Sequence, residues 1–303
     1  MTVPLAIETT ALTKSFGARK AVDSLDLAVP TGSIYGFLGP NGAGKTTTIR
    51  MLVGLAKPSE GGIEIQGVSV DEDRSSVHKH VGVLLDEGGF YPRLSARANL
   101  MLLRRLAGDE PDKAWVDQTL ERVGLGSRAD DRVGTYSHGM HRRLGLAAAL
   151  VGRRSVLILD EPGNGLDPPG LRDLRNLMQS LRDDGMTIFL SSHLLGEVER
   201  VCDQVCILNE GRQVFQGSMT DLTSGATRVM VRIEDASSAE RVLREEGWGV
   251  EVVPGGVALR GVSGTDINRA LAARGLFADS IQDEASALEE SFFSLLQVKA
   301  EEP

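Results

Sequence analysis

The pattern of apolar and polar positions divides the chain into two regions. In the first region, residues 34–38, 81–85 and 156–159 form short, unbroken apolar runs. Such runs predict strands of a parallel sheet, because a strand that is covered on both faces needs no polar alternation. Glycine-rich or acidic loops and helix-like stretches follow the runs. This order predicts an α/β domain over about residues 1–220.

After residue 220 the pattern changes. Residues 227–235 alternate as a strand does, and residues 248–262 read as a hairpin around a Pro-Gly-Gly turn. Two helical stretches, a fourth strand and a closing helix are predicted at residues 237–247, 265–275, 276–284 and 286–296. The order βαββαβ predicts a small α+β domain of the ferredoxin-like type over residues 221–303, with one helix appended. Residues 217–225 are predicted to be the linker.

Length and composition agree with a large and a small globular domain. The chain has 303 residues, of which 41% are hydrophobic and 25% charged, so neither a disordered nor a fibrous protein is expected. Aromatic residues make up 4%, which predicts a mainly aliphatic core. The longest apolar runs are far shorter than the roughly 20 residues that span a bilayer, and no export signal opens the chain. We therefore expect a cytoplasmic protein.

Charge and cysteine content narrow the possible partners. Residues 221–303 hold 8 basic and 15 acidic side chains, a net charge of −7 within a total of −9. Because neither region forms a basic surface, we expect no nucleic-acid partner. Cys202 and Cys206 are the two cysteines, and their spacing fits neither a zinc nor a CxxC site, so we expect both to be buried and inert.

The strongest chemical signal is the segment GPNGAGKTTT, which connects the apolar run 34–38 to a helix. Gly39, Gly44, Lys45 and Thr46 match the phosphate-binding P-loop pattern G-x-x-x-x-G-K-[ST]. The glycines bring backbone N–H groups to phosphates, Lys45 reaches the terminal phosphates, and the Thr46 hydroxyl reaches Mg²⁺. The alternative is a glycine-rich turn with a solvated lysine. The residues expected around the nucleotide are Gly39, Pro40, Asn41, Gly42, Ala43, Gly44, Lys45, Thr46 and Thr47.

A second predicted strand ends in two acids. Residues 156–159 are apolar, and Asp160 and Glu161 follow them directly. Asp160 is predicted to hold Mg²⁺ through water, and Glu161 to polarise the attacking water. The alternative is that the two acids only cap the following turn.

Three segments together identify a family. GPNGAGKTT, VLILDEPGNGLDP and LSSHLLGEVE resemble the nucleotide-binding subunit of ABC transporters, and the resemblance covers about residues 5–220. It implies an ABC ATPase core with a helical subdomain at about residues 93–150, which binds ATP with Mg²⁺. It further implies that Phe16 stacks on adenine and that His193 contacts the γ-phosphate and Glu161. Asp167 belongs to the D-loop, residues 165–168.

The same resemblance explains TYSHGM, residues 135–140, as the signature segment. Ser137 and Gly139 lie at the start of a predicted helix, whose N-terminus attracts phosphate. In the family this phosphate belongs to a second ATPase subunit. His138 replaces a usual glycine and Met140 a usual glutamine. A Ser-His nucleophile is not expected without an orienting third group. Arg142 and Arg143 are expected on the helix surface rather than on ATP.

One position departs from the family. Asp86 stands where a glutamine usually touches Mg²⁺ and the attacking water and also lies against the permease. An aspartate brings a negative charge towards the phosphates, so it is tolerated only if Mg²⁺ or a basic group compensates or if the side chain stays withdrawn. We expect it to face the metal. The alternative is that Asp86 only caps its loop.

The final helix indicates the kind of transporter. LEESFFSLL resembles the C-terminal segment of multidrug and antibiotic export ATPases, whose permease is a separate chain. The resemblance implies a homodimer that docks on that permease at the inner face of the membrane. The alternatives are a soluble ABC protein acting on ribosomes or DNA, which would carry a second cassette or long inserts, and an inactive scaffold lacking Glu161 or Lys45. For residues 221–303 we expect a regulatory or dimer-supporting role.

Overall fold

The computed structural model describes residues 4–85, 89–152, 154–223, 228–283 and 287–298. The chain divides into two compact units, Met1–Gly217 and Ser218–Pro303. The predicted linker at residues 217–225 is wrong in part. Residues Met219–Thr223 form a short helix, α8, because Met219 and Leu222 find apolar surroundings and are buried.

The first unit is built around a six-stranded sheet in the order β11-β10-β4-β9-β8-β7. Five of its strands pair in parallel, namely β10 (Gln204–Asn209), β4 (Ile34–Leu38), β9 (Thr187–Ser192), β8 (Val156–Asp160) and β7 (Val81–Leu84). Strand β11 (Arg212–Ser218) forms the edge beside β10. Every residue of β4, β8 and β9 is buried, as the unbroken apolar runs predict.

Aromatic side chains occupy the centre of this sheet, although the core is otherwise mainly aliphatic. The ring of Phe189 stacks on that of Tyr35 with centroids 5.7 Å apart and lies 5.2 Å from that of Phe37. Together the three rings tie β4 to β9, the strands whose ends carry part of the predicted site.

A second sheet covers the P-loop helix α1 (Lys45–Leu52). Its strands are β2 (Arg19–Leu25), β1 (Leu5–Phe16), β5 (Glu60–Ile65) and β6 (Val68–Ser69) in that order, with β3 (Ala28–Pro30) also paired to β1. One hydrophobic cluster joins Ile7 and Ile63 of this sheet to Ile49 of α1 and to Phe37 and Ile158 of the central sheet. Helix α1 is therefore held between the two sheets.

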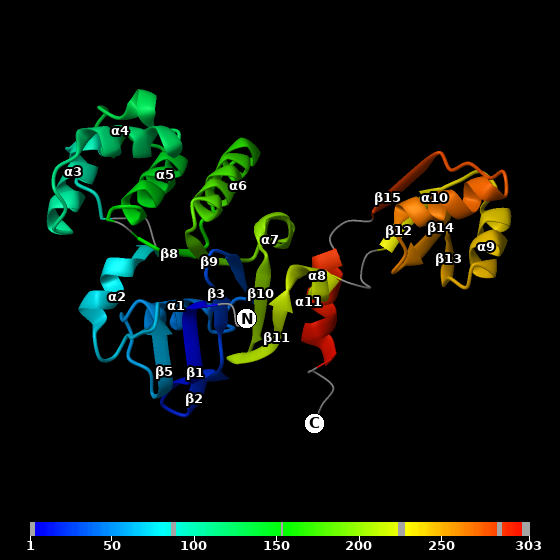
Figure 1. The fold of residues 1–303 in the computed structure, drawn as a ribbon, viewed down its shortest axis with the longest axis horizontal. Helices are drawn as coiled ribbons and strands as arrows, with labels where there is room; N and C mark the ends of the chain where they lie inside the picture. The colour runs from blue at the N-terminus through cyan, green and yellow to red at the C-terminus, as the bar shows by residue number, and fades with distance from the viewer. Residues whose placement is uncertain (1–3, 86–88, 153, 224–227, 284–286, 299–303) are drawn as a thin grey trace. The chain divides into compact units, whose positions relative to one another are not determined.

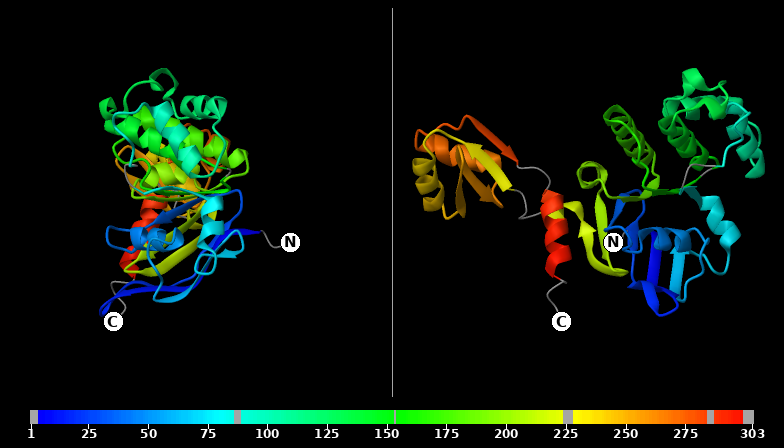
Figure 2. Two further views of the ribbon diagram at one scale, coloured as in Figure 1. Left: turned by 90° about the vertical axis from the view of Figure 1, so that its left-hand side faces the viewer. Right: turned by 180° about the vertical axis from the view of Figure 1, so that it is seen from behind.

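The remaining helices of this unit are α2 (Arg74–His80), α3 (Ala96–Leu106), α4 (Lys113–Arg122), α5 (His138–Ala149), α6 (Pro168–Asp183) and α7 (Leu195–Val201). Figures 1 and 2 show α3, α4 and α5 grouped at one end of the unit, away from β1 and β5. Polar side chains start these helices, since Ser95, Asp112 and Ser137 accept hydrogen bonds from the first turns of α3, α4 and α5.

The second unit has the predicted βαββαβ order. Its elements are β12 (Arg228–Arg232), α9 (Ala236–Glu245), β13 (Val250–Val253), β14 (Gly256–Arg260), α10 (Gly264–Ala273) and β15 (Ser280–Asp283). The strands form an antiparallel sheet in the order β13-β14-β12-β15, and α9 and α10 bury their apolar faces against it. The appended helix α11 (Ala287–Val298) contacts α8, where the Ser291 hydroxyl donates to the Leu222 carbonyl at 2.9 Å.

No helix within the described part of the chain combines the length and apolar character that a membrane span requires.

Candidate active site

The P-loop connects the end of β4 to the start of α1. Gly44 caps α1 with a φ of 110°, a left-handed conformation that favours glycine. A Cβ atom at this position would lie 2.4 Å from the carbonyl oxygen of Ala21. The close approach of strand β2 therefore excludes any side chain here, and the loop backbone lies open at the N-terminus of α1.

Lys45 is buried at the base of this loop. Its side chain lies within hydrogen-bonding distance of the loop itself, because Nζ donates to the Gly39 carbonyl at 2.6 Å. Burial lowers the pKa of Lys45, while the charges of Glu161 and Asp160 act in the opposite direction. The amine thus stands between the loop carbonyls and the two acids.

Ser191 joins the two acids at the end of β8. It lies opposite Asp160 in the parallel pairing of β8 and β9. Its hydroxyl donates to Oδ1 of Asp160 at 2.5 Å and accepts the backbone N–H of Glu161 at 2.9 Å. The Thr46 hydroxyl donates to Oδ2 of Asp160 at 3.2 Å. Ser191 could not be predicted from the sequence, since a serine at a strand end matches no motif by itself.

Glu161 and His193 meet beside these residues. Glu161 has a φ of 49°, which places a non-glycine residue in the left-handed region. Its Oε2 lies 2.8 Å from Nδ1 of His193 and 3.3 Å from the His193 backbone nitrogen. Because an ionised carboxylate only accepts hydrogen bonds, Nδ1 carries a proton in this pair. The contact that the resemblance implies between the two side chains is present.

One cavity of about 680 Å³ brings most of the predicted nucleotide-binding residues together, although Gly39, Ala43 and the predicted metal ligand Asp160 are not among the residues that line it. It is lined by Phe16, Arg19, Ala21, Pro40, Asn41, Gly42, Gly44, Lys45, Thr46, Thr47, Glu161, Asn164 and His193. Phe16 lies at the edge of this cavity and is 59% exposed. Nζ of Lys14 lies 5.3 Å from the centroid of its ring. Arg19, Ala21 and Asn164 are not predicted from the sequence: Arg19 and Ala21 belong to no predicted motif, and Asn164 lies within VLILDEPGNGLDP at a position to which that motif assigns no role.

The signature segment lines a different cavity, of about 580 Å³. Ser137 caps α5 and accepts the Met140 N–H at 3.3 Å, while Asp167 caps α6 and accepts the Gly170 N–H at 2.9 Å. Ser137, Gly139 and Asp167 all line this cavity, and none of its lining residues belongs to the P-loop cavity. Within one chain, then, the signature segment and the P-loop do not share a site.

The expectation that Arg142 lies on the helix surface is wrong. Its side chain is buried, and Nη2 donates to the Asp160 carbonyl at 2.8 Å and also to the Glu161 carbonyl. The reason is the packing of α5 against the central sheet at β7, which turns this face of the helix inwards, towards the turn that follows β8. The neighbouring Arg143 is only partly exposed and forms an ion pair with Asp173 at 2.9 Å.

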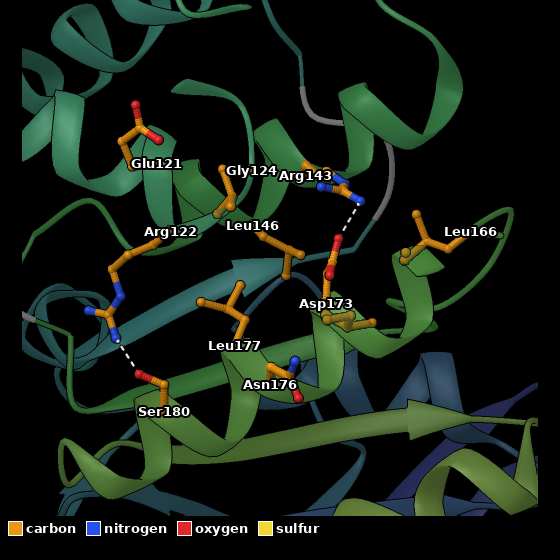
Figure 3. Close-up of a pocket in the computed structure, with 13 residues that line it drawn as sticks. Glu121, Arg122, Gly124, Arg143, Leu146, Leu166, Asp173, Asn176, Leu177 and Ser180 are labelled. Carbon is orange, nitrogen blue, oxygen red and sulfur yellow. Dashed lines mark hydrogen bonds and ion pairs between the residues drawn. The ribbon is translucent and has the colours of Figure 1, made fainter. Parts of the chain in front are cut away.

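Figure 3 shows the region between α6 and the helices α4 and α5, which Arg143 spans. The Arg143–Asp173 pair joins α5 to α6, and the Arg122 guanidinium at the end of α4 donates to the Ser180 hydroxyl at 3.2 Å. Between them lies a cavity of about 380 Å³. Two polar contacts therefore link the helical group to α6.

Two further expectations concern other positions. Asp86 lies outside the described residues, so its side chain is not placed. Cys202 and Cys206 are both buried free thiols, and burial raises the pKa of each, as an inert role requires.

Comparison with known proteins identifies the family. The ABC transporter profile matches residues 22–164. The bacitracin transport ATP-binding protein of Enterococcus faecalis is 35% identical over 302 residues, which cover 98% of each chain. The chain belongs to the ABC transporter family. As an ABC ATP-binding subunit it is an ATPase.

Other relatives and a solved structure agree with this assignment. The bacitracin transport ATP-binding protein of Bacillus licheniformis is 47% identical over 207 residues, 68% of this chain and 67% of that protein. The daunorubicin/doxorubicin resistance ATP-binding protein of Streptomyces peucetius is 37% identical over 248 residues, 80% and 75% of the two chains. A solved ATP-binding subunit of an ABC transporter superposes with a TM-score of 0.66 at 25% identity, covering 89% of this chain and 100% of that one.

Proposed function

We propose that two copies of this ATPase subunit bind ATP with Mg²⁺, close on each other, hydrolyse the ATP and drive export through a separate membrane permease. One observation carries the proposal. Lys45, Thr46, Glu161 and His193 line a single cavity at the carboxyl ends of β4, β8 and β9. Ligands of open parallel sheets bind at that edge.

In this proposal the cavity holds ATP. Phe16 stacks on adenine, which suits a ring that is more than half exposed at the cavity rim. The backbone of residues 39–47 and the amine of Lys45 hold the phosphates. The positive end of α1 adds to this attraction.

The residues present fit a magnesium ion. Thr46 and Asp160 offer oxygen atoms 3.2 Å apart, and Mg²⁺ prefers oxygen ligands. Among the described residues no group of three His, Cys, Asp or Glu side chains could bind a metal alone. This suits Mg²⁺, which keeps waters and takes further ligands from substrate phosphates. Bound there, it would neutralise charge on the phosphates.

Glu161 and His193 are proposed to act on the reacting groups. Glu161 accepts a proton from the water that attacks the γ-phosphate. His193 holds the Glu161 carboxylate through its Nδ1–H and contacts the γ-phosphate. Lys45 stabilises the negative charge of the transferring phosphoryl group.

The second subunit completes each site. Ser137, Gly139 and Asp167 are proposed to contact the ATP that is bound by the P-loop of the partner copy. The support is their position in a cavity that shares no lining residue with the P-loop cavity. Since every such subunit carries both halves, a homodimer forms two equivalent sites.

We further propose that the permease docks on an apolar groove between the central sheet and the helical group. This groove, of about 480 Å³, is lined by Val83 of β7 and Leu103 of α3, among others. Leu55 and Leu106 at its edges are 68% and 73% exposed. Exposed apolar side chains of this kind favour a protein partner, here an apolar cytoplasmic segment of the permease. The subunit would then sit at the inner face of the membrane.

The names of the relatives support the proposed cargo class. Two of them are named for bacitracin transport and one for daunorubicin and doxorubicin resistance. We propose that the cargo here is likewise a drug, an antibiotic or another small hydrophobic compound, recognised by the permease. No nucleic-acid partner is proposed, because the chain carries a net charge of −9.

Glu161→Gln tests the proposal. The amide cannot accept the proton, so ATP turnover should fall about 10²-fold or more while ATP binding remains. Size-exclusion chromatography with ATP and Mg²⁺ should then show a stable dimer, and without ATP a monomer. A variant that still hydrolyses ATP at the parental rate would reject the role of Glu161.

A further inference from the structure

Arg142 contacts the turn that carries Glu161 through hydrogen bonds to its backbone. Its Nη2 donates to two consecutive carbonyl oxygens, those of Asp160 and Glu161. We propose that Arg142 is a positioning residue, which fixes the direction of the Glu161 carboxylate by fixing its backbone. This inference rests on the catalytic role proposed for Glu161.

The Glu161 backbone needs such support. Its φ of 49° is unfavourable for a residue with a side chain and persists only where the surroundings determine it. The Ser191 hydroxyl holds the N–H of Glu161 at 2.9 Å, and Arg142 holds its carbonyl. Both backbone polar groups of this residue are thus fixed: the N–H by a neighbouring strand, and the carbonyl by α5 and by the Asn164 N–H, which donates to it at 3.1 Å.

Arg142 acts through Glu161 and not on the nucleotide. Its side chain is 6% exposed and does not line the P-loop cavity, whereas Glu161 does. Burying a guanidinium is costly unless hydrogen bonds compensate for lost water, and the two carbonyls provide such bonds for Nη2. Because the backbone sets the direction of the Cα–Cβ bond, these bonds keep Oε2 of Glu161 beside His193.

Replacing Arg142 tests this assignment. A misplacement of about 1 Å can cost about 10²-fold in rate, so Arg142→Gln should lower kcat about 10- to 100-fold. The KM for ATP and the affinity for ATP should stay within about twofold, since no binding contact is lost. With ATP and Mg²⁺ the variant should accumulate as a dimer, as we also expect of Glu161→Gln. Arg142→Lys keeps the charge but loses the fork geometry, so its kcat should be intermediate.

Arg154→Gln is the matched control. The Arg154 guanidinium also donates to two backbone carbonyls, those of Val151 and His78, neither of which belongs to the turn that carries Glu161. Its loss should leave the kcat of the isolated subunit within about twofold of the parental value. Equal losses of kcat in Arg142→Gln and Arg154→Gln would show a general structural effect and overturn the proposal.

Folding and the role of Glu161 are tested separately. If Arg142→Gln does not fold, as thermal unfolding would reveal, the folded Arg142→Lys variant decides, and a parental kcat there rejects the inference. If Glu161→Gln is inactive while folded Arg142→Gln keeps the parental kcat, the inference fails and the proposed function stands. If Glu161→Gln itself hydrolyses ATP normally, the proposed catalytic role fails first.

Discussion

Nδ1 of His193 lies 2.8 Å from Oε2 of Glu161, so a side-chain contact joins the residues that follow two neighbouring strands, β9 and β8. The side chain of His193 is 53% exposed and that of Glu161 only 20%. His193 is therefore the more solvent-exposed member of the pair, and Glu161 the more buried one. This arrangement suits a base that is oriented by a neighbour which can also reach the substrate.

The first prediction concerns this pair. His193→Ala removes the donor that orients the Glu161 carboxylate and, in the proposed mechanism, a contact to the γ-phosphate. We expect kcat to fall about 10²-fold, with ATP affinity changed much less. Steady-state ATPase assays and equilibrium binding of ATP measure the two effects. A His193→Ala variant with parental kcat would show that the hydrogen bond has no part in hydrolysis.

The second prediction concerns the partner copy. Ser137 and Lys45 line separate cavities of one chain, so each is expected to act at a different ATP of the dimer. Ser137→Arg and Lys45→Ala subunits should each be inactive alone. Mixed together, they form heterodimers with one intact composite site, and ATPase activity should reappear. Differently tagged subunits verify that heterodimers form, and an inactive mixture of such heterodimers would contradict action in trans.

Features of the site that depend on a contiguous stretch of sequence could be predicted, whereas those that depend on tertiary packing could not. The P-loop is a continuous strand, loop and helix, so its shape follows from Gly39 to Thr46 alone. Glu161 and His193 come from distant segments, and the family resemblance was needed to bring them together. Nothing local distinguishes the buried Arg142 from the partly exposed Arg143, because the packing of α5 against β7 of the central sheet decides which face turns inwards.

The same contrast between tertiary and local features applies to Ser191 and to the second unit. Ser191 matters through its register opposite Asp160, and register is a property of two strands rather than of one. The βαββαβ order of residues 228–283 could be predicted, because alternation and turn residues are local. The short helix α8 could not be, since five residues within a predicted linker carry too little periodicity.

The third prediction concerns Asp86, which lies outside the described residues just after β7. If it faces the metal, Asp86→Ala should raise the Mg²⁺ concentration needed for half-maximal ATPase activity. Nucleotide affinity without metal should not change, and Asp86→Gln should recover most of the activity. An unchanged Mg²⁺ titration for the alanine variant would assign Asp86 to its loop or to the permease contact.

The fourth prediction concerns the apolar groove. Leu106→Glu places a charge in the proposed permease contact, 73% exposed and far from the P-loop cavity. Basal ATPase activity of the isolated subunit should be unchanged, while co-purification with the permease should be lost. Phe277→Glu, at a similarly exposed apolar position outside the groove, is the control and should keep the complex. Retention of the permease by Leu106→Glu would remove this groove as the docking surface.

The last prediction concerns the contact between the signature segment and the D-loop. Gly165 has a φ of 73°, and a Cβ there would lie 2.5 Å from Cδ2 of His138. Gly165→Ala must therefore displace the imidazole or the loop that carries Asp167, and ATPase activity should fall. Gly185→Ala separates this effect from backbone strain, since Gly185 has a φ of 90° and no neighbouring atom within 4 Å of the added Cβ. Both variants should lose about 1–2 kcal/mol of unfolding free energy, but only Gly165→Ala should lose activity.

A second set of variants tests whether the His138 imidazole is what the added methyl group at position 165 meets. His138→Gly restores the residue usual in the family and leaves space for the methyl group that Gly165→Ala adds, so the double variant His138→Gly/Gly165→Ala should regain the activity of His138→Gly alone. Coupled ATPase assays on the parental subunit, the two single variants and the double variant, with thermal unfolding to compare stability, complete the cycle. Equal losses of activity in Gly165→Ala and Gly185→Ala would trace the effect to backbone strain. Equal activity of Gly165→Ala with and without His138→Gly would show that the imidazole is not what the methyl group meets.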